Sequence, residues 1–307
     1  MITKIAGSKK DIFYLMNKHS KAIAKVEAEM LLEYLFNCTK LDLYIRDFAV
    51  DETIEELYDS LVSRRLNKEP VQYMTGCAEF MGLDFIVTRD VLIPRPETEI
   101  LVNEIINSSQ FGCFQQPHSN AIKYSSSEAT KFPNREVKIL DLCTGSGNIA
   151  VSLARLMPQA EIVATDISEG ALKIAKKNAI RNQAGDRVKF YKGNLFNALV
   201  FAKNPKFDII VCNPPYIKEG DFPFLQKEVR EEPEIALNGG KDGLDFYRII
   251  AKDSHRFLEK GGKILLEIGF GQRKAVEDIF LSYSIFDVYK VIKDFSGTER
   301  AVWINLL

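Results

Sequence analysis

The stretch "VKILDLCTGSGNIAVSLARLM", residues 137–157, decides the fold class. A short apolar run ends at a glycine-containing turn, and apolar residues at helical spacing follow at once. Short apolar runs and amphipathic segments keep alternating through the rest of the chain, until two final runs, 284–293 and 300–307, that no helix separates. This order predicts an α/β domain with a doubly wound, mostly parallel sheet, helices on both faces and an antiparallel C-terminal edge.

A helical region precedes this α/β pattern. Three segments within residues 8–68, "DIFYLMNKHSKAI", "AKVEAEMLLEYLFN" and "DETIEELYDSLVSRRL", carry apolar residues three and four positions apart, which predicts amphipathic helices. In the third segment we expect Asp51 to be the N-cap and one buried face to hold Ile54, Leu57, Leu61 and Leu66. We therefore expect a small N-terminal helical bundle domain at residues 1–75.

Two further stretches divide the remaining chain. Residues 76–96 combine short apolar runs with glycines and prolines, which predicts a hairpin linker. The main domain then covers 97–307. Within it, residues 107–135 are rich in Ser, Asn, Gln and Pro with little periodicity, as expected of a long exposed loop or a disordered insertion.

Composition narrows the class of protein and of partner. The 307 residues are 46% hydrophobic and 27% charged, with a formal net charge of −1, which is typical of a soluble globular protein. A protein that holds a long polyanion usually has a basic surplus, so we expect a protein or small-molecule partner and no direct nucleic-acid contact. No apolar run reaches the roughly 18 to 20 residues of a membrane helix, and we expect neither a signal nor an anchor.

The cysteines point to a reducing compartment. They are scattered, odd in number and without a CxxC pair, which argues against a disulfide framework and against a zinc knuckle. We therefore expect a cytoplasmic protein without a metal site. The five are Cys38, Cys77, Cys113, Cys143 and Cys212.

The turn "DLCTGSGNIA", residues 141–150, indicates a nucleoside site. Gly145 and Gly147 permit a tight turn that a ligand can approach closely, and a helix begins immediately after it. The spacing is Cys-x-Gly-x-Gly rather than GxGxxG, with Cys143 where the first glycine would stand, and no GK[ST] phosphate loop follows. The prediction is therefore a nucleoside-binding turn without a clear phosphate cradle.

Asp166 ends the next predicted strand, nineteen residues after Gly147. A carboxylate at about this distance can accept two hydrogen bonds from a ribose diol. The alternative is that Asp166 only caps a helix that starts at Ser168. The residues alone do not separate the two readings, but the preceding turn favours ribose.

The segment "NPPYI", residues 213–217, follows the apolar run "FDIIVC". Two prolines lack N–H groups and have restricted backbone angles, so the loop is stiff and presents carbonyl oxygens. An asparagine oxygen beside a proline carbonyl can accept both protons of a planar NH2 group, and a tyrosine adds a flat face. The alternative is a turn that merely ends a strand, as Asn-Pro often does.

These motifs, in this order, resemble those of S-adenosylmethionine-dependent methyltransferases that modify exocyclic amines or amides. The resemblance implies a Rossmann-like class I fold with a seven-stranded sheet and a reversed last strand. Four further segments narrow it to the release factor glutamine methyltransferase family, also called the HemK or PrmC type: "EPVQYMTG", "IPRPETE", "NGGKDGLDFY" and "EIGFGQ". The resemblance spans nearly the whole chain apart from residues 107–135.

The resemblance implies roles for individual residues. The turn after the first strand would hold the methionine part of S-adenosylmethionine and Asp166 its ribose, while Asn213 would lie between cofactor and substrate. The implied cofactor-binding residues are Cys143, Thr144, Gly145, Ser146, Gly147, Asp166, Asn194, Leu195 and Asn213; the implied substrate-binding residues are Asn213, Pro214, Pro215 and Tyr216, of which Asn213, Pro214 and Tyr216 are the catalytic candidates.

The sequence departs from the family pattern in two segments. Family members often have an acidic residue and then an aromatic one near the adenine, whereas "GNLF" places Asn194 and Leu195 there. Asn194 can still hydrogen-bond adenine, and Phe196 is a candidate to replace the missing aromatic surface. Cys143 stands where the pattern has glycine.

The resemblance implies methyl transfer to the amide nitrogen of the glutamine in the Gly-Gly-Gln loop of peptide chain release factors, without a metal or a covalent intermediate. We expect a monomer whose residues 1–75 bind the factor. The alternatives are a glutamine of a ribosomal protein and the amino group of adenine in nucleic acid. Arg95, in "IPRPETE", either acts at the domain junction or pairs with Glu97 or Glu99. None of the three histidines lies near these motifs, so no strong general base is visible.

Overall fold

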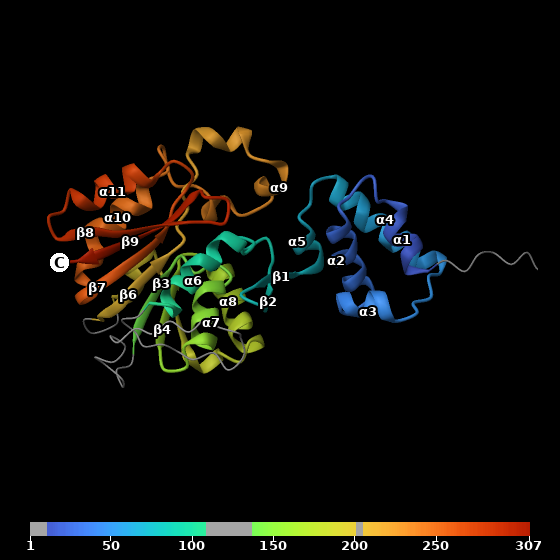
Figure 1. Ribbon diagram of the computed structural model, residues 1–307, viewed down its shortest axis with the longest axis horizontal. Helices are drawn as coiled ribbons and strands as arrows, with labels where there is room; N and C mark the ends of the chain where they lie inside the picture. Colours follow the sequence, from blue (N-terminus) through green and yellow to red (C-terminus); the bar gives the residue numbers. More distant parts are fainter. Residues whose placement is uncertain (1–10, 109–136, 201–204) are drawn as a thin grey trace, which may run out of the picture. The chain divides into compact units, whose positions relative to one another are not determined.

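The computed structural model describes residues 11–108, 137–200 and 205–307, and the chain divides into two compact units (Figure 1). Unit 1 comprises Met1–Cys77 together with Gln226–Glu231, and unit 2 comprises Ala78–Leu225 and Glu232–Leu307. A short segment from the second half of the chain therefore belongs to the helical unit.

Amphipathic helices build unit 1. Asp51 caps α4 as predicted, because its Oδ1 accepts a hydrogen bond from the backbone N–H of Ile54 at 2.9 Å. The helices of this unit are α1 (Ile12–Lys18), α2 (Lys25–Phe36), α3 (Lys40–Ile45), α4 (Glu52–Leu66), α5 (Val71–Thr75) and α9 (Lys227–Arg230).

The buried face of α4 differs from the expectation. Leu61 is buried, but Leu57 and Leu66 are 49% and 50% exposed. Tyr58 and Val62 are buried beside Leu61 instead. Three residues at three- and four-residue spacing form one narrow stripe of the helix, and Leu57 and Leu66 fall outside it.

Unit 2 is built on a seven-stranded sheet, counted over the described residues, with the order β5-β4-β3-β6-β7-β9-β8. The first five strands in this order, β5, β4, β3, β6 and β7, are parallel to one another. Their bounds are β3 (Lys138–Leu142), β4 (Glu161–Asp166), β5 (Val188–Lys192), β6 (Phe207–Cys212), β7 (Leu258–Glu267), β8 (Phe286–Lys293) and β9 (Glu299–Leu306). The predicted fold class is confirmed.

The central strands are buried on both faces. In β3, Ile139 belongs to the hydrophobic core on one side of the sheet, and Leu140 and Leu142 to the core on the other side. Figure 1 shows α6, α7 and α8 on the first side and α10 and α11 on the second. Their bounds are α6 (Glu99–Ile106), α7 (Asn148–Leu156), α8 (Glu169–Arg181), α10 (Asp245–Asp253) and α11 (Arg273–Leu281).

Short 3-10 helices occupy several of the connections in this unit. They are η1 (Pro96–Thr98), η3 (Gly185–Arg187), η4 (Leu195–Leu199), η5 (Glu219–Phe224), η6 (Glu234–Ala236) and η7 (Ser254–Arg256). Because parallel strands bring their carboxyl ends to one edge, η4 and η5 follow strands that end at the same edge as β3.

The C-terminal strands form the expected antiparallel hairpin. The last strand, β9, lies between β7 and β8 and is antiparallel to both. It is therefore the reversed strand that the family resemblance implied, and β8 is the edge of the sheet. The antiparallel direction also places the start of β9, near Arg300, beside the carboxyl end of β7.

The segment at the predicted linker contains a two-stranded hairpin, β1 (Cys77–Phe80) and β2 (Leu83–Ile86). The predicted insertion at 107–135 lies outside the described residues, apart from 107 and 108. Within the described ranges, no helix is both long and apolar enough to span a bilayer.

Candidate active site

Backbone hydrogen bonds, one to the neighbouring strand β4 and one within the turn, fix the turn after β3. Thr144 N–H donates to the carbonyl of Thr165 in β4 at 3.0 Å, and Gly147 N–H donates to the carbonyl of Thr144 at 2.8 Å. Gly147 has a positive φ of 81° and is the N-cap of α7. A Cβ at Gly147 would lie 3.1 Å from the Cβ of Ala175 in α8, so glycine also allows the two helices to approach.

Asp166 is joined directly to this turn. Its Oδ2 accepts from the backbone N–H of Gly145 at 2.9 Å, and its Oδ1 accepts from the backbone N–H of Ser168 at 2.8 Å. The cap of α8 is Ser168, whose Oγ accepts from Ala171 N–H at 3.1 Å. Asp166 therefore positions the segment before the helix without being its cap. Its two oxygens offer about four acceptor sites, which leaves acceptor capacity for a ligand beside the backbone donors Gly145, Ile167 and Ser168.

Cys143 adopts the backbone conformation that favours glycine. Its φ is +57°, in the left-handed region that residues with a Cβ rarely occupy. This explains why the family pattern has glycine at the position. It also identifies Cys143 as a strained residue at the base of the turn, a feature common at ligand sites.

Asp141, in β3, holds the turn through Thr144. It is fully buried, and its Oδ2 accepts from the hydroxyl of Thr144 at 2.6 Å. Burial raises the pKa of Asp141 to about 7, opposed by the hydrogen bond from Thr144. Burial likewise raises the pKa of Asp166, against the hydrogen bonds from Ser168 and Gly145.

The predicted adenine-side residues follow β5. Gly193 N–H donates to the backbone carbonyl of Asp166 at 2.9 Å, which brings this segment next to Asp166. Asn194 is exposed, and Leu195 is buried with a positive φ of 47°. Phe196 is not a substitute for the missing aromatic surface, because its ring is buried and stacks on Phe257 at 4.7 Å between centroids.

The NPPY loop lies next to the glycine turn. Strands β3 and β6 pair in parallel, with Leu142 opposite Cys212, so Cys143 and Asn213 leave the sheet side by side. All six residues of β6 are buried, which fixes the strand end from which the loop starts. Pro214 and Pro215 are buried as well. The glycine turn and the NPPY loop therefore lie at the same edge of the sheet.

Asn213 has its side-chain amide fixed by two residues absent from the predicted site. Its Nδ2 donates to the hydroxyl oxygen of Thr98 at 3.1 Å, and the Thr98 hydroxyl donates to Oε2 of Glu267 at 2.6 Å. Burial raises the pKa of Glu267 to about 7, opposed first by the Thr98 hydrogen bond. Glu267 is therefore the titratable group that this hydrogen-bond chain joins to the NPPY loop.

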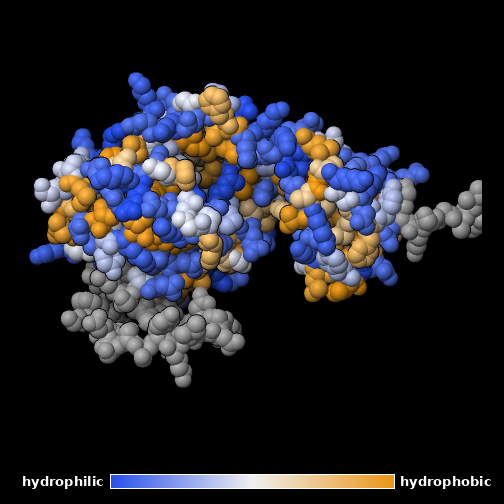
Figure 2. Space-filling view, turned by 45° about the horizontal axis from the view of Figure 1, so that its top comes forward, coloured by the Kyte–Doolittle hydropathy of each residue, from blue (hydrophilic) through white to orange (hydrophobic). Residues whose placement is uncertain are grey.

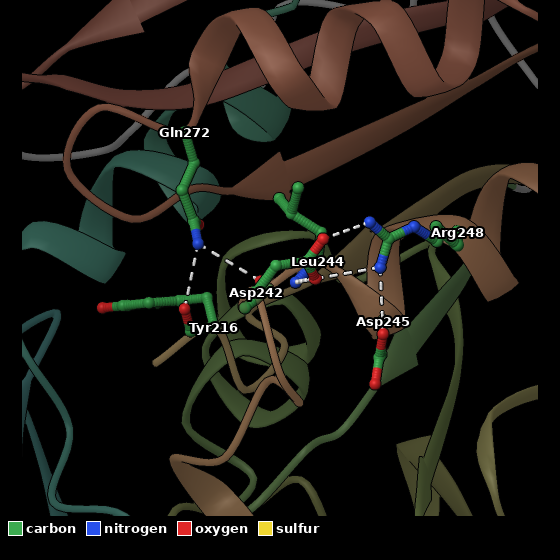
Figure 3. Close-up of polar contacts among 7 residues, drawn as sticks. Tyr216, Asp242, Leu244, Asp245, Arg248 and Gln272 are labelled. Carbon is green, nitrogen blue, oxygen red and sulfur yellow. Dashed lines mark hydrogen bonds and ion pairs between the residues drawn. The ribbon is translucent and has the colours of Figure 1, made fainter. Parts of the chain in front are cut away.

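Gln272 connects the NPPY loop to two other loops. Its Nε2 donates to the backbone carbonyls of Tyr216 and Gly243, at 2.9 Å and 3.2 Å (Figure 3). Its Oε1 accepts from Gly269 N–H at 2.9 Å. The side chain is 8% exposed. Three backbone segments thus share one buried amide, which restricts the backbone at Tyr216.

The segment 238–243, "NGGKDG", packs directly on the NPPY backbone. Ile217 N–H donates to Leu237 O at 2.9 Å, and Gly239 N–H donates to Ile217 O at 2.8 Å. A Cβ at Gly239 would lie 2.7 Å from Cα of Tyr216, so only glycine fits this contact. On the outer side of the same segment, Arg248 bonds Asp242 and Asp245 in an exposed cluster (Figure 3).

Arg95 pairs with a residue other than the two expected. It forms an ion pair with Glu232, whose other oxygen accepts from Ile93 N–H at 3.0 Å. Glu99, one of the expected partners, accepts instead from Met81 N–H at 2.7 Å. Local spacing suggested Glu97 or Glu99, but the fold brings the buried Glu232 from more than a hundred residues away.

Three supporting residues were thus not predicted: Thr98, Glu267 and Gln272. Each lies inside a segment that entered the sequence analysis only as part of a resemblance, "IPRPETE" for Thr98 and "EIGFGQ" for the other two. A polar residue that follows a buried strand was the available signal, since Glu267 ends β7 as Asp166 ends β4.

Comparison with known proteins places the chain. The PrmC N-terminal domain family matches residues 14–76, and the methyltransferase small domain family matches residues 128–241. A release factor glutamine methyltransferase of Geobacter sulfurreducens is 39% identical over 282 residues, 91% of this chain and 88% of that protein. The chain belongs to the release factor glutamine methyltransferase family.

Two further relatives match most of the chain, and one solved structure shares its fold. A release factor glutamine methyltransferase of Thermodesulfovibrio yellowstonii is 38% identical over 94% of both chains. A bifunctional methyltransferase of Rickettsia felis is 39% identical, and there the chain spans 55% of the relative's length. The hMettl16 catalytic domain, crystallised with the MAT2A 3'UTR hairpin 6, shares the fold, with a TM-score of 0.50, 15% identity and coverage of 79% of this chain and 81% of that one.

The cofactor of this methyltransferase family is S-adenosylmethionine, and the residues present fit it. A Cβ at Gly145 would meet no atom within 4 Å, so the turn faces open space. Asp166 adds a carboxylate beside the turn, because its Oδ2 accepts from Gly145 N–H. The fit is weakest on the predicted adenine side, where Leu195 is aliphatic and buried.

Proposed function

We propose that this chain transfers a methyl group from S-adenosylmethionine to the side-chain amide nitrogen of the glutamine in the Gly-Gly-Gln motif of peptide chain release factors. The observation that carries the proposal is the orientation of Asn213. Its NH2 end is engaged by Thr98, which leaves Oδ1 as the end of the amide that can accept from a substrate. An acceptor fixed next to the glycine turn suits a planar NH2 group.

The substrate amide is a weak nucleophile, because its nitrogen lone pair is delocalised. We propose that Asn213 Oδ1 and the carbonyl oxygen of Pro214 each accept a hydrogen bond from the substrate NH2 group. These two hydrogen bonds fix the plane of the group. Both are oriented dipoles that stabilise positive charge on the nitrogen as the N–C bond forms, and the nitrogen then loses one proton to a carbonyl or to water. Bound S-adenosylmethionine supplies an electrophilic methyl group on a sulfonium.

The stiffness of the loop supports this role. Pro214 and Pro215 have no N–H to compete for the acceptors, and Gln272 and Gly239 hold the backbone that follows. Tyr216 remains protonated, because burial and the nearby Glu267 carboxylate raise its pKa. Its ring is thus a neutral surface for the glutamine side chain.

The partner is proposed to be a folded protein. The net charge of −1 provides no general attraction for nucleic acid. Unit 1 has exposed apolar side chains, and Figure 2 shows hydrophobic atoms on its surface. They include Phe13, Val26, Tyr34, Leu41, Ile45 and Leu57. We propose residues 1–75 as the substrate-binding domain, 76–96 as the linker and 97–307 as the methyltransferase domain of a cytoplasmic monomer.

The test is transfer of labelled methyl groups to a panel of substrates: a purified release factor, ribosomal proteins and duplex DNA. The expected result is label in the release factor alone. Label in DNA but never in the release factor would overturn the proposal in favour of an adenine amino methyltransferase, and label in a ribosomal protein alone would favour that substrate.

A further inference from the structure

Three side chains from separate elements form one hydrogen-bond chain. Asn213 follows β6, Thr98 ends η1 before α6, and Glu267 ends β7. The Nδ2 of Asn213 lies 3.1 Å from the Thr98 hydroxyl oxygen, which lies 2.6 Å from Oε2 of Glu267. Thr98 is 1% exposed and Glu267 is 2% exposed, so water does not compete for either group.

The chemistry of the chain sets its direction. An ionised carboxylate can only accept, so the Thr98 hydroxyl must give its single proton to Glu267. The hydroxyl oxygen is then an acceptor toward Asn213, and it selects the NH2 end of the amide. The two ends of an asparagine amide have nearly the same shape, and sterics alone would not distinguish them.

We propose that Thr98 and Glu267 are positioning residues that hold the Asn213 amide with its Oδ1 toward the substrate NH2. This inference rests on the proposed function and adds residues that do not themselves touch the substrate. In the reversed orientation, Asn213 would present N–H to the substrate N–H, so the acceptor and its charge stabilisation would be lost.

The hydrogen-bond chain also predicts a pH dependence. Once Glu267 is protonated, the Thr98 hydroxyl no longer has to donate to it. A protonated carboxyl can donate to Thr98, whose hydroxyl can then donate to Asn213 Oδ1 and reverse the amide. The charged and titratable groups that act on Glu267 are Arg300 from β9, Glu97 from η1 and Tyr216 from the NPPY loop. Arg300 favours the ionised form of Glu267, and Glu97 opposes it. We therefore expect turnover to fall as the pH decreases through the pKa of Glu267.

The test compares Thr98→Val, which keeps the shape and removes the hydroxyl, with Thr98→Ser, which keeps the hydroxyl. The expected result is a loss of kcat of roughly 10- to 100-fold in the valine variant, with KM for the release factor and Kd for S-adenosylhomocysteine within about threefold of wild type. The serine variant should regain most of kcat. Equal kcat in wild type and Thr98→Val would overturn the inference.

A second variant keeps the inference testable if Thr98→Val does not fold. Glu267→Gln cannot titrate, and its Oε1 can accept from Thr98 at any pH. The expected result is a kcat profile without the acidic fall seen in wild type, whatever the plateau value. A fall of the same position and depth in Glu267→Gln would contradict the inference. Failure of wild type to methylate any release factor would instead refute the proposed function.

Discussion

Gln272 donates its Nε2 to the backbone carbonyl of Tyr216 at 2.9 Å, from a side chain that is almost fully buried (Figure 3). The contact ties the end of the NPPY loop to the loop that follows β7. The loop thus owes its position to tertiary hydrogen bonds as well as to its prolines.

Replacing Gln272 with Leu should lower both stability and turnover. The change leaves the carbonyls of Tyr216 and Gly243 without this donor in a buried place, at a cost of about 1–3 kcal/mol in the free energy of unfolding. We expect kcat to fall about tenfold or more, because a loosened loop no longer orients its acceptors. Urea unfolding and steady-state kinetics measure the two effects.

The matched control is Arg248→Ala, in α10, whose exposed side chain bonds Asp242 of the segment 238–243. Exposed ion pairs contribute about 0–1 kcal/mol, so this variant should keep near-normal stability and kcat. An equal loss of kcat in both variants would mean that the segment, rather than the Gln272 contact, supports the loop.

Replacing Gly239 with Ala should displace the NPPY backbone. The added Cβ would lie 2.7 Å from Cα of Tyr216 and 2.9 Å from the carbonyl of Pro215, and neither backbone group can move without moving the loop. We expect transfer to the release factor to fall at least tenfold, while affinity for S-adenosylhomocysteine changes little. Gly220→Ala is the control, because its Cβ would meet no atom within 4 Å. Full activity of Gly239→Ala would show that the loop tolerates the shift.

Replacing Asp166 with Ala should weaken cofactor binding more than any later step. The change removes the proposed ribose acceptor and the partner of Gly145 N–H. Charge-assisted hydrogen bonds contribute about 1.5–3 kcal/mol, so Kd for S-adenosylhomocysteine should rise roughly 10- to 100-fold in calorimetry. Glu169→Ala, at a neighbouring exposed carboxylate, should leave Kd near the wild-type value. An unchanged Kd in Asp166→Ala would refute the ribose assignment.

The buried carboxyls predict how stability varies with pH. Burial raises the folded-state pKa of Glu267 to about 7 from 4.5, so between these values the folded chain binds a proton that the unfolded chain releases. Stability from this group is therefore present below about pH 4.5 and is lost as the pH rises through 7, at about 1.4 kcal/mol for each unit by which the pKa is raised. Asp141 acts in the same direction, with a pKa of about 7.

The measurement is urea unfolding at about pH 5 and about pH 8 for wild type and Glu267→Gln. The decrease in unfolding free energy from the lower to the higher pH should be smaller in the variant, since Glu267 no longer contributes to it and the other buried carboxyls are unchanged. The same decrease in both proteins would mean that Glu267 is ionised in the folded state across the range.

The fold was largely predictable from the sequence, because the spacing of apolar residues and the order of the predicted strands and helices determine it. The alternation of short apolar runs and amphipathic segments that starts at Val137 predicts the parallel strands. The two final apolar runs, which no helix separates, predict the antiparallel hairpin of β8 and β9. Because parallel strands end together, the predicted sheet also accounts for the glycine turn, Asp166 and Asn213 lying at one edge.

The residues that support the site were less predictable, since their roles depend on distant partners. Thr98 acts on Asn213 across more than a hundred positions, and Arg95 finds Glu232 at a similar separation. Packing also overrode local expectation at Phe196, whose ring joins the core against Phe257. The spacing of residues along the sequence does not indicate such contacts, because only the folded domain brings these residues together.

The most direct test of the central claim is to map the methyl group on a release factor after incubation with the protein and S-adenosylmethionine. Tandem mass spectrometry should locate one methyl group on the side chain of the glutamine in Gly-Gly-Gln, and Asn213→Ala should abolish it while retaining cofactor binding. A methyl group on any other residue, or an unmodified release factor alongside a methylated nucleic acid, would contradict the account.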